Sequence, residues 1–296
     1  MKYLKKFNED NIPGNAPIQK QLHVFDFDDT LGVTKNPNGV MLYKNGKPAH
    51  KTEKDVLEWL SKYGISDSDL LPGPDGKKIQ FFDNLGGCAA YVDSAKLAAL
   101  TKSDEFETKD KRYATGDKED PNWKGLPPEN IDQALYIDFT PSGFIDLKTT
   151  KPIKNVIMKL GDMEDKGADT MIMTARKGTG EGVNFKGEKV PITNSKDIQD
   201  FLDNNGDDSS KTKVIGVIGG DKGEEIKKEI VKKGSWPEEI HFYDDAGQNT
   251  NAVEKELGGK VPAEVYIYGP GEFEKGEANP NKPTKTFKHN LPRKVN

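Results

Sequence analysis

Short apolar runs and segments of helical periodicity alternate along the second half of the chain. The strand-like runs, rich in branched and aromatic residues, are Thr170–Met173, Val214–Ile218, Glu239–Tyr243 and Val265–Tyr268. The segments with apolar residues at helical spacing are Lys151–Lys166, Ser195–Asn204, Lys222–Lys233 and Gln248–Leu257. Strands that alternate with helices of this length are typical of parallel βαβ units. The pattern therefore predicts an α/β fold with a doubly wound, Rossmann-like, mostly parallel sheet.

Another strand-like run, Gln21–Phe27, lies near the N-terminus and leads into carboxylates. Its apolar residues suit a strand buried on both faces of a parallel sheet, and Asp26, Asp28 and Asp29 lie at its end. Ligands of open α/β sheets collect at the carboxyl ends of the strands. There, Asp26 offers a nucleophile for phosphorus, and Asp28 offers a group that can move a proton. A strand that simply runs into an acidic loop is the alternative interpretation.

The periodicity is weak between this first strand and the βαβ pattern. The elements expected there are a hairpin that starts at Val40, a helix over Thr52–Tyr63, a strand near Lys78–Phe82 and a helix near Asp93–Leu100. Asn45-Gly46 favours a type I′ turn, and Thr52 is a good helix cap. The remainder is interpreted as surface loop. An insertion beside a site can act as a lid that reads the substrate, and a partner-binding surface or a passive ornament are the alternatives.

These patterns give an expected division of the chain. The parts are an extended lead-in at 1–21, a catalytic core at 22–31 and 144–268, an inserted cap or flap region at 32–143, and an extended tail at 269–296 that is rich in Pro and Lys.

Composition narrows the class of protein further. Hydrophobic residues make up 33% and charged residues 31% of the 296 positions, so long polar segments must surround an economical core. The net charge of −5 gives no electrostatic reason to expect a nucleic-acid coat or an anionic membrane as the partner. Cys88 is the single cysteine, which excludes an intrachain disulfide. The sequence has no membrane-length apolar run and no signal-peptide pattern, so a cytoplasmic protein is expected.

Three later strand ends carry side chains suited to phosphate chemistry. Thr174 would offer a hydroxyl to phosphate oxygens, although an ordinary turn explains it as well. Lys222 opens a helix and would neutralise charge near a nucleophile, although Lys is abundant here and most are solvated. Asp244 and Asp245, with Asn249 after them, form a candidate site for a hard cation such as Mg²⁺. Asp245 is also a candidate cap of the next helix.

The order of these residues resembles the haloacid dehalogenase (HAD) superfamily of Asp-nucleophile phosphohydrolases. The residues that match its four motifs are Asp26–Leu31, Thr174, Lys222, and Asp244 and Asp245 with Asn249. The resemblance covers roughly 22–31 and 150–268. The tripeptides Thr174-Ala175-Arg176 and Tyr243-Asp244-Asp245 are similar to motifs in the phosphatase domain of polynucleotide kinase-phosphatases and in phage-encoded relatives. The chain has no Gly-x-x-x-x-Gly-Lys-Ser/Thr loop, so a kinase half is not supported.

The resemblance implies a role for each matching residue. Asp26 would attack the phosphoryl group and form an aspartyl-phosphate. Asp28 would protonate the leaving oxygen and then activate the hydrolytic water. Thr174 and Lys222 would hold the phosphoryl oxygens. Arg176, one of only three arginines, would either contact the substrate or brace its loop.

The resemblance also implies one cofactor, Mg²⁺. Its ligands would be the Asp26 carboxylate, the Asp28 main-chain carbonyl, Asp244 and Asp245. The expected function is then a Mg²⁺-dependent phosphomonoesterase that acts on a phosphorylated small molecule, a nucleotide or a nucleic-acid end. The alternative is a protein of this fold with a mainly structural role, which binds protein partners through its insertion and tail.

Overall fold

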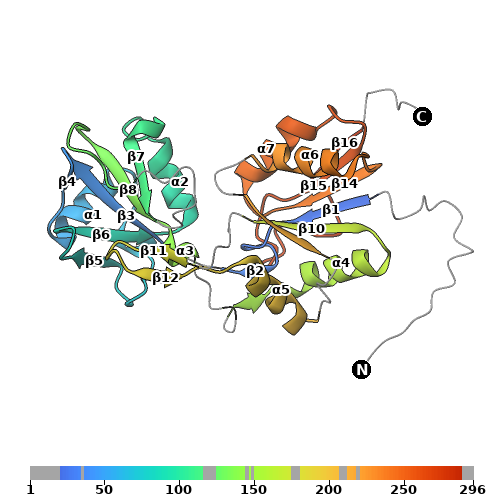
Figure 1. The fold of residues 1–296 in the computed structure, drawn as a ribbon, viewed down its shortest axis with the longest axis horizontal. Coiled ribbons are helices and arrows are strands. Elements are labelled where there is room, and N and C mark those ends of the chain that lie inside the picture. Colours follow the sequence, from blue (N-terminus) through green and yellow to red (C-terminus); the bar gives the residue numbers. More distant parts are fainter. Residues whose placement is uncertain are drawn as a thin grey trace, which may run out of the picture.

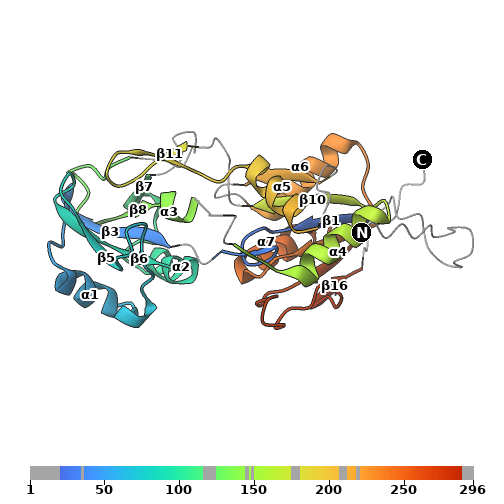
Figure 2. The ribbon, with the colours of Figure 1, turned by 90° about the horizontal axis from the view of Figure 1, so that it is seen from below.

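The chain forms two lobes, each built around one β-sheet (Figure 1). The computed structural model describes residues 21–34, 37–115, 125–143, 147, 150–174, 181–206, 212–217 and 221–288. The two lobes lie beside each other in both views (Figure 2). None of the helices in this described part combines the length and the apolar character that a membrane crossing needs.

The first lobe, the core lobe, contains a six-stranded sheet in the order β13-β10-β1-β14-β15-β16. Its strands are β1 (Gln21–Phe25), β10 (Asp169–Thr174), β13 (Lys213–Gly216), β14 (Glu239–Tyr243), β15 (Glu264–Tyr268) and β16 (Lys285–Phe287). The first five are parallel to their neighbours, and only β16 is antiparallel. The expectation of an α/β fold with a mostly parallel central sheet is confirmed.

Helices cover both faces of this sheet (Figure 1). The helices are α4 (Lys154–Asp165), α5 (Ser195–Asn204), α6 (Lys222–Lys233) and α7 (Gly247–Leu257). The apolar sides of α4 and α5 pack in one buried cluster with Phe25 and Phe27. Those of α6 and α7 pack in a second cluster with Val24 and Phe242. Successive residues of β1 therefore point into opposite clusters, as in a strand buried on both faces.

The start of α6 is set by a local cap. Oδ1 of Asp221 accepts hydrogen bonds from the backbone N–H of Gly223 at 2.8 Å and of Glu224 at 3.2 Å. A cap of this kind stabilises a helix by about 1 kcal/mol. The helix ends at Gly234, whose φ of 79° is left-handed. Both signals are local, which explains why the sequence predicts the bounds of α6 correctly, with Lys222 as its first residue.

The second lobe, the inserted lobe, has its own sheet in the order β5-β6-β3-β8-β7. Its strands are β3 (Asn38–Lys44), β4 (Lys47–Pro48), β5 (Ile79–Phe82), β6 (Gly87–Val92), β7 (Arg112–Thr115) and β8 (Ala134–Asp138). Its helices are α1 (Glu53–Ser61), α2 (Ser94–Lys102) and the 3₁₀ turns Asp67–Asp69 and Lys109–Lys111. The predicted hairpin is confirmed, because β4 pairs with β3 and both Asn45 and Gly46 have positive φ. The capped helix at Thr52 is confirmed as well.

The prediction that the rest of the insertion is surface loop is wrong. Strands β6, β7 and β8 lie in that region, and every residue of β6 and β8 is buried. The sequence of β6, Gly-Cys-Ala-Ala-Tyr-Val, has no polar alternation because both of its faces are covered. On one face, α1 and α2 form a hydrophobic cluster with the sheet. Cys88 is one of the small buried residues of that cluster.

The other face of this sheet is covered by a hairpin from later in the chain. Strands β11 (Glu181–Val183) and β12 (Lys189–Pro191) lie between the predicted strand Thr170–Met173 and the predicted helix Ser195–Asn204, where the sequence pattern predicts no element. Phe185 in its turn is buried against Phe82 and Tyr136 of the inserted lobe. Its backbone N–H donates to Asp138 Oδ2 at 2.8 Å, and its carbonyl accepts from Asn84 at 2.8 Å. Two separate segments therefore build the inserted lobe.

The C-terminal tail differs from the sequence prediction. Phe273 and Ala278 of the tail are buried in the core lobe, and β16 adds an edge strand, so the tail predicted to be extended packs on the core lobe and contributes a strand after Val265–Tyr268. The tail is so rich in Pro and Lys that this short strand could not be recognised from the sequence.

The short strands β2 (Gly32–Val33) and β9 (Lys151–Pro152) pair where the chain leaves and re-enters the core lobe, and α3 (Thr140–Gly143) precedes the return.

Candidate active site

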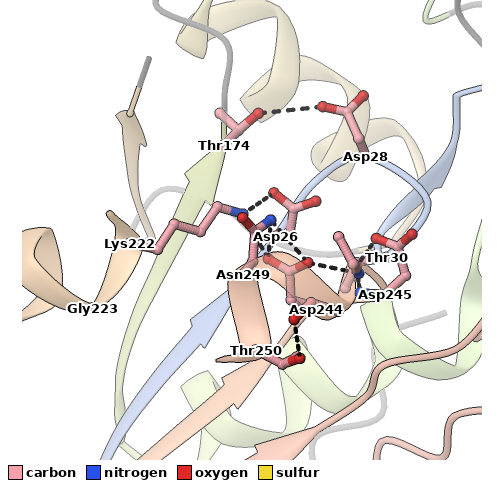
Figure 3. A network of polar contacts seen from close by, with 12 residues as sticks. Asp26, Asp28, Thr30, Thr174, Lys222, Gly223, Asp244, Asp245, Asn249 and Thr250 are labelled. Atoms are coloured by element: carbon pink, nitrogen blue, oxygen red, sulfur yellow. Dashed lines mark hydrogen bonds and ion pairs between the residues drawn. The ribbon is translucent and has the colours of Figure 1, made fainter. Parts of the chain in front are cut away.

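Two aspartates and one lysine meet at the carboxyl ends of the central strands. Phe25 and Tyr243 are register partners on β1 and β14, so the next residues, Asp26 and Asp244, emerge side by side. Lys222 Nζ reaches between them, 2.6 Å from Asp26 Oδ1 and 2.7 Å from Asp244 Oδ2 (Figure 3). The structure thus brings together three residues that are far apart in the sequence.

All three groups are removed from solvent. The exposed fractions are 5% for Asp26, 0% for Asp244 and 4% for Lys222. Burial raises the pKa of Asp26 well above its usual range, Lys222 opposes this, and nearby Asp244 raises it again. Burial by itself lowers the pKa of Lys222, but Asp244 and Asp26 outweigh it, so the net shift is upward and the ammonium stays charged. One buried ammonium faces two carboxylates, which leaves the cluster short of positive charge.

Asp244 is held in a fixed orientation. Its Oδ1 accepts from the backbone N–H of Ala246 at 2.9 Å. Asn249 Nδ2 donates to both of its oxygens, at 3.1 and 2.9 Å. Asn249, which lies on the first turns of α7, is therefore a positioning residue for this carboxylate.

Asp245 is tied to the loop that follows β1. Thr30 Oγ1 accepts from the Asp245 backbone N–H at 3.2 Å and lies 3.4 Å from Asp245 Oδ1. Burial raises the pKa of Asp245 to about 7, and Asp244 and Asp29 add to the rise. Ala246 is the N-cap residue of α7, with no side-chain cap, so the structure does not support a capping role for Asp245.

The acidic residues fit a divalent cation. Asp26, Asp244 and Asp245 each offer one carboxylate oxygen, and these atoms lie within 4.8 Å of one another. Oxygens on opposite sides of an octahedral Mg²⁺ lie roughly 4.2 Å apart, so a small inward movement would suffice. The donor set is all oxygen, as Mg²⁺ prefers, and its three carboxylates have only the Lys222 ammonium beside them.

Asp28 and Thr174 lie together on another side of the cluster (Figure 3). Thr174 ends β10, and its Oγ1 lies 3.5 Å from Asp28 Oδ2. Thr34 Oγ1 donates to Asp28 Oδ1 at 2.7 Å. The Asp28 carboxylate is not part of the acidic triad in the described residues. It faces the threonines instead.

Three residues around the site could not be assigned a role from the sequence pattern. Thr30 lies inside the first motif, but its bond to Asp245 depends on the fold. Thr34 has no motif around it. Gly269 has a φ of 118°, and a Cβ there would lie 2.0 Å from the Asp244 carbonyl oxygen. A Gly-Pro dipeptide after the last parallel strand is the one signal that marks this close approach.

Arg176 lies outside the described residues, as do Gly219 and Gly220 before Lys222. The remaining predicted site residues, Asp26, Asp28, Thr174, Lys222, Asp244 and Asp245, all lie at the carboxyl edge of the core sheet or in the loops that leave it.

Comparison with known proteins found no matching family model, no matching curated protein and no matching solved structure.

Proposed function

We propose that the protein is a Mg²⁺-dependent phosphomonoesterase of the haloacid dehalogenase type, with Asp26 as its nucleophile. The observation that carries the proposal is the buried Asp26–Lys222–Asp244 cluster at the carboxyl edge of a parallel sheet. Taking two carboxylates and an ammonium out of water is costly, and a structural role alone does not require it. Such clusters are a feature of catalytic sites.

The arrangement of the core lobe supports a doubly wound fold. Along the sheet, β13, β10 and β1 run in reverse chain order, and β14 and β15 then continue on the other side of β1. The strand order therefore reverses at β1, and Asp26 lies directly beyond it. Ligands of such sheets bind in the crevice at that point.

The chemistry follows from the positions of two carboxylates. An Asp26 oxygen attacks phosphorus, the bond from phosphorus to the ester oxygen breaks, and Asp28 gives its proton to that leaving oxygen. Water then attacks the aspartyl-phosphate and gives a proton to Asp28. The bond from Asp26 to phosphorus breaks, and free phosphate and the Asp26 carboxylate are restored.

The surrounding groups prepare these two residues. Lys222 lowers the pKa of Asp26 against the effect of burial, which favours the ionised nucleophile, and its ammonium carries a charge for the phosphoryl oxygens. Thr174 Oγ1 lies 3.5 Å from Asp28 Oδ2, at the upper limit of a hydrogen bond, and we assign this hydroxyl as a donor to a phosphoryl oxygen. Thr34 holds Asp28 more firmly.

Mg²⁺ would be held by Asp26, Asp244 and Asp245, with the Asp28 main-chain carbonyl as a fourth protein ligand. When bound, it supplies positive charge against the phosphoryl oxygens.

A phosphate-release assay tests the proposal. Asp26→Asn keeps the size of the side chain and removes the nucleophile, so turnover of an aryl phosphate with Mg²⁺ should fall roughly 10⁴-fold or more. Asp169→Asn is the matched control, because Asp169 lies at the opposite end of β10 and pairs with Lys233 at 3.0 Å. Its rate should equal that of the parent. Equal rates for Asp26→Asn and the parent would end the proposal.

The candidate substrates are phosphorylated small molecules and nucleic-acid ends. Comparing kcat/KM on a 3′-phosphorylated oligonucleotide with that on the matching mononucleotide separates them. Equal values would count against the nucleic-acid end.

A further inference from the structure

Six aromatic rings stand in two rows across the three strands that carry the site. The upper row is Phe25, Tyr243 and Tyr268, with ring centres 4.3 and 4.2 Å apart and planes within 14°. The lower row is His23, His241 and Tyr266, with centres 4.2 and 4.7 Å apart and planes within 6°. Each row follows the register of β1, β14 and β15.

Two hydrogen bonds join the rows diagonally, each from one strand to the next. His23 Nδ1 on β1 lies 3.1 Å from the Tyr243 hydroxyl on β14. His241 Nδ1 on β14 lies 2.9 Å from the Tyr268 hydroxyl on β15. Parallel rings can slide over one another at little cost, whereas a hydrogen bond of this length cannot stretch far. The diagonals therefore add a side-chain constraint on the relative heights of the three strands, beyond the backbone hydrogen bonds of the parallel ladder.

The direction of the second bond follows from its neighbour. His241 Nε2 lies 3.0 Å from Glu239 Oε2, and a carboxylate only accepts, so Nε2 carries the proton. In neutral His241, Nδ1 then accepts from the Tyr268 hydroxyl. The Tyr268 hydroxyl is thus the donor that anchors β15 to β14.

The upper row lies directly beneath the site. The residues that follow Phe25, Tyr243 and Tyr268 are Asp26, Asp244 and Gly269. The Asp26 backbone N–H donates to the Tyr243 carbonyl at 2.8 Å, and that of Asp244 donates to the Tyr268 carbonyl at 3.1 Å. A shift of one strand would therefore change the separation of the two carboxylates.

We propose that the two imidazole–phenol bonds, His23–Tyr243 and His241–Tyr268, are a positioning device that sets the spacing of Asp26 and Asp244 for a divalent cation. The proposal rests on the proposed function, because it takes these carboxylates as the cation's ligands. Tyr243 and Tyr268 are positioning residues that act through the strand ends. Groups that orient metal ligands typically change affinity by 10–100-fold when they are removed.

The chain offers a matched pair of variants. Tyr268→Phe keeps the ring and removes the hydroxyl that bonds to His241. Tyr266→Phe makes the same change on the same strand, but its hydroxyl bonds to Glu264 at 2.6 Å and takes no part in the diagonals. Tyr243→Phe removes the other diagonal and provides a second test.

The measurement is Mg²⁺ affinity by calorimetry on the full, metal-free chain, with circular dichroism to verify folding. Tyr268→Phe and Tyr243→Phe should each bind Mg²⁺ about 10-fold more weakly than the parent, and Tyr266→Phe within twofold of it. Aryl phosphate turnover at a fixed low Mg²⁺ concentration should show a lower kcat with an unchanged KM. A purely structural role of the two bonds would lower the thermal stability of Tyr268→Phe and Tyr243→Phe and leave their Mg²⁺ affinity at the parent value.

Two results overturn the proposal: parent-like Mg²⁺ affinity in folded Tyr268→Phe and Tyr243→Phe, or an equal loss in Tyr266→Phe. If both hydroxyl variants fail to fold while Tyr266→Phe folds, the bonds maintain the fold rather than the spacing, which also overturns it. A parent that binds Mg²⁺ but hydrolyses no phosphate ester would remove the proposed function and leave this test intact.

Discussion

Replacing Lys222 with Met is the sharpest test of the charge balance in the site. The change keeps an unbranched side chain of similar length and removes the ammonium that lies 2.6 Å from Asp26 and 2.7 Å from Asp244. Both carboxylates are almost fully buried, so neither can turn to water for compensation. The variant therefore leaves two buried negative charges without a counterion.

The expected cost follows from that burial. Removing one partner of a buried ion pair destabilises a protein by about 3–5 kcal/mol. Lys233→Met is the control, because Lys233 ends the same helix, is half-exposed and pairs with Asp169 at the surface. An exposed pair contributes about 0–1 kcal/mol. The two variants should thus differ in unfolding free energy by several kcal/mol.

Two conditions should reduce the difference in unfolding free energy between Lys222→Met and the parent. Mg²⁺ at 100 times its dissociation constant stabilises a folded state by about 2.7 kcal/mol, and in the variant no ammonium competes with it. Lower pH should act in the same direction, because burial already raises the pKa of Asp26 and a protonated carboxyl needs no counterion. The stability of the variant should therefore rise as pH falls from 8 toward 5.

Urea unfolding, followed by circular dichroism in Mg²⁺-free buffer, measures the effect. Unfolding of Lys222→Met at the same urea concentration as Lys233→Met would show that Lys222 does not balance a buried charge. If neither Mg²⁺ nor lower pH reduces the difference in unfolding free energy between Lys222→Met and the parent, lost packing rather than unbalanced charge causes the destabilisation.

Three further predictions concern the structure around the site. Gly269→Ala should destabilise the protein by about 1–3 kcal/mol in urea unfolding, because φ is 118° and the new Cβ would press on the Asp244 carbonyl; unchanged stability would contradict the geometry. Burial raises the pKa of Asp138 from 3.8 to about 6, so its contribution to stability is full below pH 4 and is lost as pH rises through 6, by up to about 3 kcal/mol. Asp138→Asn should remove the contribution of Asp138 to the difference in unfolding free energy between pH 5 and pH 8. An unchanged pH dependence in Asp138→Asn would contradict this role of Asp138. Phe185→Ala should cost about 3–5 kcal/mol and speed tryptic cleavage at Lys186 and Lys189, whereas parent-like cleavage would mean that the ring does not anchor the hairpin.

Much of the core lobe could be predicted from sequence alone. The strand Glu239–Tyr243 and the helix Lys222–Lys233 are predicted and observed with the same bounds. Their signals are local: a branched or aromatic run, a helical period, a cap at Asp221 and a glycine at 234. The position of Asp26, Lys222 and Asp244 at strand ends follows from these elements, because parallel strands present their carboxyl ends at one edge.

The inserted lobe could not be predicted in the same way. Strand β6 has small buried residues with no alternation, and its faces are covered by helices and by a hairpin from beyond residue 180. Nothing in the local sequence of Gly87–Val92 states which distant segment will cover it. The hairpin around Phe185 could not be predicted either, because the burial of Phe185 depends on the distant residues Phe82 and Tyr136.

The sequence by itself determined which residues stand at the ends of the core strands, because caps, periods and strand runs act over a few neighbouring positions. Only the tertiary structure decided which ends adjoin, that Lys222 bridges Asp26 and Asp244, and that Gly269 lies under the Asp244 carbonyl. The Asp26–Lys222 contact joins the end of β1 to a helix 196 residues later. The energies of these contacts depend on burial that no local pattern encodes.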